Sequence, residues 1–263
     1  MQHLSYMTEK TNKEDKIKAR LDSLIFDKGL VKSRHRARAM IMAGKIMVND
    51  IPVDKPGVLV SIHAKILVKE DNNPFVSRGG LKLEEALQTI PVSVKGMTCL
   101  DIGASTGGFT DCLLQYGACK VYAVDVGYGQ FDWTLRQDPR VVVIERTNIR
   151  YMPYEMINEK VDLVVADTSF ISLKIVIPSA EKFMKEDALI LALIKPQFEA
   201  GKKNIGKGGV VKDPEVREMV IEDIKVFFQE RGYRINLVVP SPVLGPKGNM
   251  EYILSLNYKE YLK

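Results

Sequence analysis

Five short apolar runs alternate with longer segments of mixed polarity from about residue 97 onward. They are MTCLDI (97–102), KVYAVDV (120–126), RVVVIE (140–145), VDLVVAD (161–167) and ALILALIK (188–195). Nearly continuous apolar runs of this length are typical of strands buried on both faces, and the intervening segments are long enough for helices. The alternation predicts an α/β fold with a parallel sheet that is covered by helices on both faces.

The pattern differs near the end of the chain. The stretch DPEVREMVIEDIKVFFQERG (213–232) has helical periodicity, and two strand-like segments follow it, YRINLVVP (233–240) and EYILSLNY (251–258). Because these two segments lie close together in the sequence, we expect them to form an antiparallel pair at one edge of the sheet.

The first 70 residues predict a second, smaller α+β unit. Apolar residues at helical spacing begin after Asp15, and Gly29 stands where a helix-ending glycine is expected. Ser33 can cap a second helix, RHRARAMIMAG (34–44), and short strands separated by turns are predicted in 45–70. The apolar residues of the first helix are Ile17, Leu21, Leu24 and Ile25, and those of the second are Ala37, Met40 and Ile41.

The positive charge of the chain is concentrated in this first segment. Residues 1–70 contain 14 lysines and arginines against 8 aspartates and glutamates, whereas residues 71–263 contain 24 against 25. A basic module of this kind indicates a polyanionic partner such as a nucleic acid. We therefore expect two modules, joined by the polar, proline-containing segment EDNNPF (70–75).

The composition argues against several classes of protein. The longest uninterrupted apolar run, ALILALI (188–194), is far shorter than the ~18 residues of a membrane-spanning helix, and the first residues have no apolar signal core. We therefore expect a soluble, cytoplasmic protein. The three cysteines, Cys99, Cys112 and Cys119, lack the spacing of metal or redox motifs, so we interpret them as small apolar residues and expect neither disulfides nor a metal site.

A glycine-containing loop follows the first predicted strand of the sheet. In LDIGASTGGFTD (100–111) the glycines let the backbone approach a ligand closely, although a tight turn alone would also explain them. The loop has neither the G-x-G-x-x-G pattern of dinucleotide sites nor the Lys-Ser/Thr ending of phosphate loops. Asp125 lies about twenty residues further on, at the end of the next strand, where a carboxylate binds a ribose hydroxyl. This combination fits the adenosyl part of S-adenosylmethionine.

The candidate cofactor residues therefore lie in this loop and after the following strands. Asn148, in ERTNIR, stands where such folds contact adenine. The full set is Asp101, Gly103, Ala104, Ser105, Thr106, Gly107, Gly108, Asp125, Asn148 and Asp167.

Four charged residues stand beside otherwise apolar or glycine-containing sequence. They are Lys82 in SRGGLKL, Asp167 in VVADTSFIS, Lys195 in LIKPQFE and Glu251 in GPKGNMEYILSL. Asp167 and Lys195 each follow an apolar strand, and open α/β folds place their sites at the carboxyl ends of the strands. Any one of these residues alone would be interpreted as a surface charge, but we expect Asp167 and Lys195 to converge on the glycine loop.

The basic segment resembles a known RNA-binding module. Residues 16–70, with two short helices followed by AGKIMVNDIPVDKPG, are similar to the small αL RNA-binding domain of a small-subunit ribosomal protein and of many RNA-modifying enzymes. The resemblance implies phosphate contacts, which carry no sequence information, from Lys32, Arg34, Arg36, Arg38 and Lys45.

The four charged residues, in their order, resemble the Lys-Asp-Lys-Glu tetrad of FtsJ-type RNA ribose 2′-O-methyltransferases. Residues 16–257 as a whole are similar to the TlyA family, on the motifs SRGGLKL, DIGASTGGFTD, ERTNIR, VADTSFISL, LIKPQFE and GPKGNMEYIL. Members are often labelled hemolysins, but the family activity is methylation of ribosomal RNA, with cytidine riboses as targets. The resemblance therefore implies a Rossmann-like, S-adenosylmethionine-dependent methyltransferase sheet, with ribosomal RNA or ribosomal subunits as the partner.

The same resemblance gives expected domain boundaries. We expect a disordered extension (1–14), the RNA-binding domain (15–70), a linker (71–76) and the methyltransferase domain (77–263).

The chemistry requires a base beside the reacting hydroxyl. A ribose hydroxyl is a poor nucleophile until its proton is removed, and a lysine can remove it only when neutral, which requires a fall from its ordinary pKa of about 10.4. We expect Lys195 to be this base and Lys82 to orient the hydroxyl or its phosphate. Asp167 and Glu251 would hold the two lysines in place.

Further basic residues are expected to face the RNA. The loop EAGKKNIGKGGVVKD (199–213) follows Lys195 directly and is interpreted either as a mobile flap over RNA or as a plain solvated loop. The candidates for RNA contact are Arg78, which precedes Lys82, and three lysines of this loop, Lys202, Lys203 and Lys207. Phe170 and Phe198 flank the expected site, and we interpret both as core residues.

Three other functions remain open from the sequence. A catalytically silent RNA-binding protein would keep the same fold, but the complete tetrad argues against it. A membrane lysin would need an amphipathic helix that the fold does not already use. A nicotinamide-dependent enzyme would need the pyrophosphate pattern that the glycine loop lacks.

Overall fold

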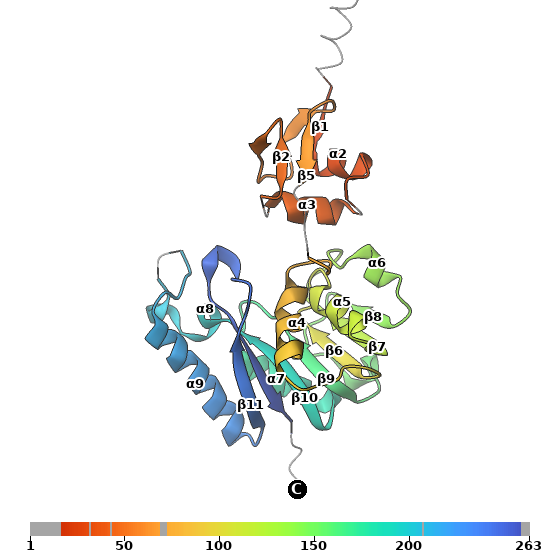
Figure 1. Ribbon diagram of the computed structural model, residues 1–263. Helices are drawn as coiled ribbons and strands as arrows, with labels where there is room; N and C mark the ends of the chain where they lie inside the picture. Colours follow the sequence, from red (N-terminus) through yellow and green to blue (C-terminus); the bar gives the residue numbers. More distant parts are fainter. Residues whose placement is uncertain (1–16, 32, 43, 69–72, 207, 259–263) are drawn as a thin grey trace, which may run out of the picture. The chain divides into compact units, whose positions relative to one another are not determined.

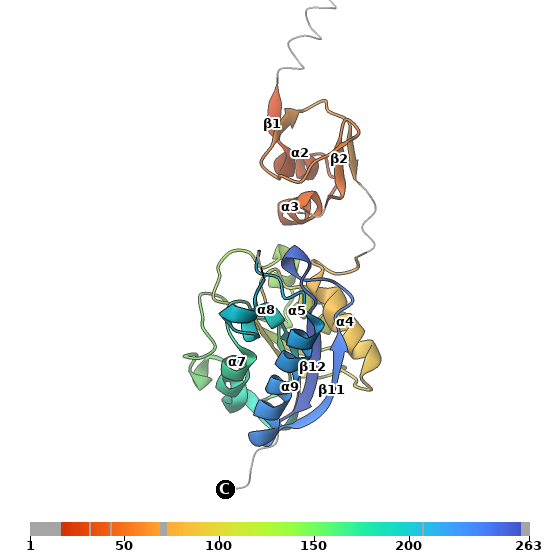
Figure 2. The same cartoon turned by 90° about the vertical axis from the view of Figure 1, so that its left-hand side faces the viewer.

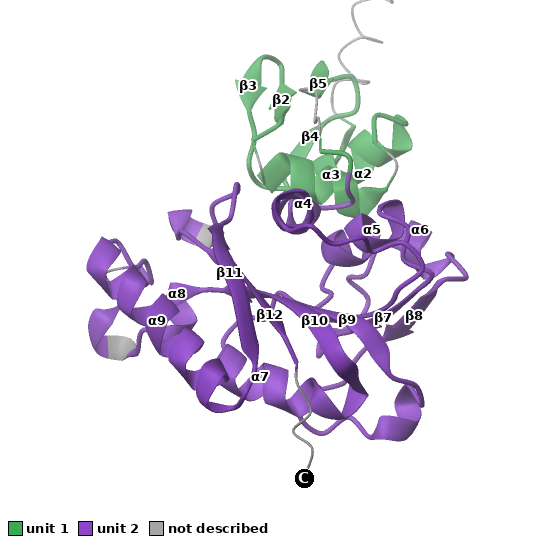
Figure 3. Cartoon of the chain, turned by 60° about the horizontal axis from the view of Figure 1, so that its bottom comes forward, with its two compact units in different colours: residues 1–74 green, residues 75–263 purple. Residues whose placement is uncertain are grey.

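The chain forms two compact units. The computed structural model describes residues 17–31, 33–42, 44–68, 73–206 and 208–258. The division falls between Pro74 and Phe75, inside the segment expected to be a linker (Figure 3). The expected extension 1–14 lies outside the described residues.

The first unit is a small α+β domain with its own core. Its strands are β1 (Lys18–Arg20), β2 (Ile46–Val48), β3 (Ile51–Pro52), β4 (Leu59–Ser61) and β5 (Ile66–Val68), and its helices are α2 (Leu21–Asp27) and α3 (Arg34–Met42). Strand β1 pairs with β4, while β2 lies between β3 and β5. As expected, Ser33 caps α3 by accepting a hydrogen bond from the Arg36 N–H at 3.1 Å, and Gly29 ends α2 with a φ of +67°.

The start of the first helix was placed wrongly from the sequence. Residues 18–20 form a strand, and the helix begins only at Leu21, whose N–H donates to the Val58 carbonyl. Antiparallel pairing with β4 occupies the backbone groups that a longer helix would need for its own hydrogen bonds. Ile17 is therefore 54% exposed, whereas Leu21 and Ile25 are buried as expected.

The second unit contains a seven-stranded sheet in the order β11-β12-β10-β9-β6-β7-β8. Its strands are β6 (Thr98–Ile102), β7 (Lys120–Val124), β8 (Val141–Ile144), β9 (Val161–Ala166), β10 (Met184–Ile194), β11 (Arg234–Pro240) and β12 (Tyr252–Asn257). Strands β6 to β10 are parallel, and β12 runs antiparallel to both β10 and β11. The predicted parallel sheet with an antiparallel edge is confirmed.

Helices cover both faces of this sheet (Figures 1 and 2). One core cluster joins the sheet to α4 (Gly79–Thr89) and α5 (Gly108–Gln115), and the other joins it to α7 (Leu173–Ala180) and α9 (Pro214–Glu230). The shorter helices are α6 (Trp133–Arg136), α8 (Pro196–Glu199) and the 3-10 turns η1 (Tyr154–Met156), η2 (Glu181–Phe183), η3 (Lys202–Asn204) and η4 (Pro246–Gly248). Within the residues that the structure describes, no helix is long and apolar enough to cross a membrane.

The strand order creates one point where the chain changes direction across the sheet. From β6 the chain proceeds outward through β7 to β8, and then returns to place β9 on the other side of β6. The loops that leave the carboxyl ends of β6 and β9 therefore diverge and leave a crevice between them. This crevice positions the candidate site.

Asp101 ties the central strand β6 to helix α5. Its side chain is fully buried, and its Oδ2 accepts a hydrogen bond from the Thr110 hydroxyl at 2.7 Å. Burial raises the pKa of Asp101 from 3.8 to about 7, and the charges of Asp167 and Asp125 add to the rise, while hydrogen bonds from Thr110 oppose it. The folded protein therefore holds a proton on Asp101 at pH values where the unfolded chain releases it.

This difference predicts a pH dependence of stability. Because the pKa is raised on folding, the contribution of Asp101 to the free energy of unfolding should fall as pH rises from about 4 to 7, and stay constant above. The Asp101→Asn variant cannot titrate at this position. Its free energy of unfolding, relative to wild type, should therefore increase by roughly 2 to 3 kcal/mol between pH 5 and pH 8 in urea titrations. A difference that does not change with pH would contradict this account.

Candidate active site

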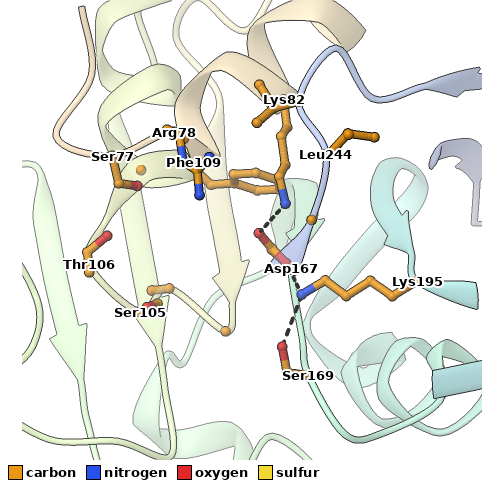
Figure 4. A pocket seen from close by; sticks show the side chains of 16 residues that line it. Ser77, Arg78, Lys82, Ser105, Thr106, Phe109, Asp167, Ser169, Lys195 and Leu244 are labelled. Carbon is orange, nitrogen blue, oxygen red and sulfur yellow. Dashed lines mark hydrogen bonds and ion pairs between the residues drawn. The ribbon is translucent and has the colours of Figure 1, made fainter. Parts of the chain in front are cut away.

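Two adjoining pockets open at the crevice between β6 and β9. The first, called the lysine pocket, has a volume of about 300 Å³ and is lined by Lys82, Lys195, Asp167, Arg78 and parts of the glycine loop (Figure 4). The second, called the Asp125 pocket, has a volume of about 830 Å³ and is lined by Asp125, Asn148 and the segment 167–172, among others. Gly103, Ser105, Asp167 and Ser169 line both pockets.

The glycines of the loop are required by close approaches of the backbone. Gly103 has a φ of +83°, and a Cβ there would lie 2.7 Å from the Asp167 carbonyl oxygen. Gly107 has a φ of +94°, and a Cβ there would lie 2.5 Å from the Leu135 side chain. A side chain at Gly103 would push the loop away from the end of β9, and one at Gly107 would push it away from Leu135. The glycines therefore both shape the turn and keep the loop against the end of β9.

Asp125 lies at the end of β7 with its carboxylate already oriented. Oδ2 accepts the Ser105 N–H at 2.8 Å, and Oδ1 accepts the Gly127 N–H at 2.6 Å. Oδ1 also accepts a longer hydrogen bond from Gln130 Nε2 at 3.4 Å, whereas Oδ2 can accept a second hydrogen bond, so Asp125 can still bind a hydroxyl group of a ligand. Asn148, after β8, lines the same pocket, and its Oδ1 accepts the Arg150 N–H.

The predicted loop residues separate into those that line the pockets and those that support them. Ala104, Thr106 and Gly108 line the lysine pocket, and Gly103 and Ser105 line both pockets. Gly107 and Asp101 line neither pocket. The expectation that Asp101 contacts a cofactor is therefore not supported, because its carboxylate is buried beneath the loop against Thr110.

The four charged residues singled out in the sequence meet in one connected group. Lys82 comes from α4, Asp167 follows β9, Lys195 follows β10, and Glu251 precedes β12. The Lys82 Nζ lies 2.6 Å from Glu251 Oε2 and 3.8 Å from Asp167 Oδ2. Asp167 Oδ1 forms an ion pair with Lys195, whose Nζ also donates to the Ser169 hydroxyl at 3.1 Å (Figure 4).

The group is largely buried and carries balanced formal charges. Lys82 is 8% exposed, Lys195 is 7% exposed and Glu251 is 1% exposed. Two ammonium groups and two carboxylates offset one another, as buried charges require, because an unpaired charge in this setting would cost several kcal/mol. The two lysines present their ammonium groups to the lysine pocket, while Glu251 lies behind Lys82 and does not line it.

The two flanking phenylalanines differ from the sequence expectation. Phe170 is 88% exposed, with a φ of +64°, so its interpretation as a core residue was wrong. Its ring centroid lies 4.9 Å from that of the partly buried Phe198, and both residues line the Asp125 pocket. Periodicity gives no guidance here, because Phe170 lies in a loop between β9 and α7. Among the cysteines, Cys99 and Cys112 are buried as expected, whereas Cys119 is exposed.

The basic residues expected to contact RNA lie on both units. In the first unit, Arg34 and Arg38 are exposed on α3, and Arg36 and Lys45 are partly exposed. In the second unit, Arg78 lines the lysine pocket and Lys203 is exposed. Lys32 and Lys207 lie outside the described residues, as does the side chain of Lys202.

Sequence reasoning missed two polar residues that touch the charged group. Ser169 hydrogen-bonds Lys195, and Gln197 donates from Nε2 to Glu251 Oε1 at 3.3 Å. Each lies two residues from a tetrad position, which is the one sequence signal that could have indicated them.

Comparisons with known proteins agree with this geometry. Residues 75–258 match the model of the FtsJ-like methyltransferase family, and residues 19–66 match that of the S4 domain. The "16S/23S rRNA (cytidine-2'-O)-methyltransferase TlyA" of Mycobacterium tuberculosis (strain CDC 1551 / Oshkosh) is 48% identical over 91% of this chain and 90% of that protein. "Hemolysin A" of Brachyspira hyodysenteriae is 41% identical over 89% of this chain and 98% of that protein.

A solved structure is similar to this chain. The structure of a "Putative hemolysin from Streptococcus thermophilus" superimposes with a TM-score of 0.73 at 40% sequence identity, covering 92% of this chain and 89% of that chain. The two family matches cover both units, and the match over residues 75–258 includes all four charged positions. The chain therefore belongs to the TlyA family of FtsJ-like methyltransferases.

Proposed function

We propose that this protein transfers a methyl group from S-adenosylmethionine to a ribose 2′-hydroxyl of ribosomal RNA. The observation that carries the proposal is the convergence of Lys82, Asp167 and Lys195 at the junction of the two pockets. One pocket has the groups that suit a nucleoside cofactor, and the other has two lysine side chains that suit a ribose and its phosphates. The proposed site of action is the cytoplasm, where ribosomal RNA is found.

The Asp125 pocket fits the adenosyl part of the cofactor. Its volume lies within the range of small-molecule sites, and Oδ2 of Asp125 retains acceptor capacity for a ribose hydroxyl. Asn148 would bind adenine, and the backbone of residues 103–106 would pass close to the ligand. When bound, S-adenosylmethionine supplies an electrophilic methyl group.

The lysine pocket supplies the groups that activate the hydroxyl. Lys195, as the neutral amine, would accept the proton of the 2′-hydroxyl, and the ammonium group that forms would pair with Asp167. Lys82 would orient the same hydroxyl or the adjacent phosphate. Asp167 fixes both ammonium groups through its two carboxylate oxygens, and positioning of this kind lowers the entropic cost of reaching the reactive arrangement.

The RNA would be held by basic residues of both units. Arg34, Arg36 and Arg38 lie on one short helix, and charge of this density suits a phosphate backbone. Lys45 of the first unit and Arg78, Lys202 and Lys203 of the second would add further phosphate contacts. The relative from Mycobacterium tuberculosis is named for cytidine in 16S and 23S rRNA, and we propose cytidine as the target base here as well.

The Lys195→Ala variant tests the proposed base. Loss of a positioned general base should slow transfer of labelled methyl to unmodified ribosomal subunits by roughly 10² to 10⁴-fold in single-turnover assays. Cofactor affinity, measured calorimetrically, should stay within about twofold, because Lys195 is not part of the Asp125 pocket. Lys185→Ala, at the other end of β10, is the matched control and should retain the wild-type rate. Binding of cofactor and subunits by the wild type with no transfer would favour the silent RNA-binding protein.

The Asp125→Asn variant tests the cofactor pocket. Asparagine has one acceptor oxygen for two backbone N–H groups and the ligand hydroxyls, so cofactor affinity should fall by roughly tenfold. The methylation rate at saturating cofactor should approach that of wild type. Asp138→Asn, which removes an ion pair with Arg140 outside both pockets, is the control. Equal loss of affinity in both variants would argue against the assignment of this pocket.

The combined Arg34→Ala and Arg38→Ala variant tests the RNA surface of the first unit. Each lost phosphate contact should lower the slope of log affinity against log salt by roughly one, with cofactor affinity unchanged. The measurement is binding of ribosomal subunits between about 50 and 200 mM salt. Lys65→Ala, an exposed lysine paired with Asp50, is the control. An unchanged salt slope would place the RNA contacts elsewhere.

A further inference from the structure

Glu251 differs from the other three charged residues because it does not reach the pocket. Its side chain is almost completely buried, and among the described residues each of its carboxylate oxygens has one donor. Oε2 accepts from Lys82 Nζ at 2.6 Å, and Oε1 accepts from Gln197 Nε2 at 3.3 Å. Glu251 therefore acts on the lysine pocket only through Lys82, and its own position depends on what surrounds Oε1.

Gln197 is a buried amide whose orientation is determined by Glu251. The residue is the second of helix α8 and is 9% exposed. Only the amide nitrogen can donate to a carboxylate, so Nε2 must face Glu251, and Oε1 is left without a hydrogen-bond partner among the described residues. A buried acceptor without a partner is unfavourable. Among the described residues, the hydrogen bond from Nε2 to Glu251 is therefore the polar contact that stabilises the Gln197 side chain.

Gly245 lies close to the same carboxylate oxygen. A Cβ at this position would overlap Glu251 Oε1 and Cδ. The φ of Gly245 does not lie in the left-handed region, so an alanine would introduce no backbone strain and would act only by displacing the carboxylate. The same glycine lines the lysine pocket, and its N–H donates to the Asn249 carbonyl at 2.8 Å.

We propose that Gln197 and Gly245 are positioning residues that hold the Glu251 carboxylate against Lys82. Gln197 fixes Oε1 by a hydrogen bond, and Gly245 leaves the space that Oε1 occupies. Together they keep Oε2 within reach of Lys82 Nζ, and thereby keep this ammonium group at the wall of the lysine pocket. The proposal rests on the proposed methyl transfer and adds two residues to the support of its active site.

The physical reason is the flexibility of lysine. A lysine side chain has four rotatable bonds, and it is held in one conformation only while its ammonium group is paired. Asp167 is 3.8 Å from Lys82 Nζ, so Glu251, at 2.6 Å, is the closer partner. If Glu251 were displaced, Asp167 would be the remaining partner of the Lys82 ammonium group among these four residues, and the Lys82 side chain could leave its position. The RNA hydroxyl would then lose the group that orients it.

Two substitutions test the proposal by different changes around Glu251 Oε1. Gln197→Met keeps the length of the side chain but removes the donor, and Gly245→Ala adds one methyl group against Oε1. Each should slow single-turnover methylation of unmodified ribosomal subunits by roughly tenfold, with cofactor affinity close to that of wild type. The melting temperature of each variant should fall, because the buried Glu251 carboxylate loses a donor or is displaced. Gln88→Met, an exposed glutamine on the helix that carries Lys82, is the control and should leave the rate unchanged.

A double-mutant cycle separates positioning from a general structural effect. In a Glu251→Ala background the residual rate should change by less than about twofold when either substitution is added, because neither has a carboxylate left to position. Wild-type rates for both single variants, or a full further loss in the Glu251→Ala background, would overturn the proposal while leaving the proposed function intact. Absence of methyl transfer by the wild-type protein would overturn both.

Discussion

The candidate site depends on the ion pairs that the Asp167 carboxylate forms with Lys82 and Lys195. This carboxylate lies at the end of β9, beside the point where the chain changes direction across the sheet, and it contacts both lysines. Two nearly buried ammonium groups would repel each other without it. The main chain of the same residue packs under Gly103, so one position fixes the glycine loop and the two lysines together. The adjacency of the cofactor pocket to the lysine pocket follows from this arrangement.

The fold brings these groups together because parallel strands end at a common edge. Asp167 and Lys195 follow neighbouring strands, and Lys82 and Glu251 reach the same place from α4 and from the start of the antiparallel strand β12. Rigid elements therefore carry all four side chains, and buried neighbours limit their freedom. A site built in this way is preorganised, because the ion pairs with Asp167 and Glu251 hold the two lysine side chains in place. Gln197 and Gly245 are proposed to position Glu251 in the same way that Glu251 positions Lys82.

Much of this organisation could be predicted from the sequence, and the failures have physical causes. Apolar runs located the strands because burial on both faces leaves a continuous signal, and the edge pair was confirmed in its antiparallel direction. Ile17 was misplaced because pairing of residues 18–20 with a strand some forty residues away overrides local helical spacing. Phe170 was misjudged because loop positions have no periodicity, and composition alone favours burial for an aromatic residue. Asp101 and Glu251 were recognised as important, but the sequence cannot show that their carboxylates face the interior and not a ligand.

The most direct test of the central claim is to identify the nucleoside that receives the methyl group. Unmodified ribosomal subunits would be incubated with the protein and S-adenosylmethionine bearing a heavy methyl label, and the ribosomal RNA would be digested to nucleosides for mass spectrometry. The account predicts that the label appears on the ribose of a 2′-O-methylated nucleoside, because the two lysines are arranged to activate a hydroxyl. Label on a base, or no label in RNA despite bound cofactor and bound subunits, would contradict it.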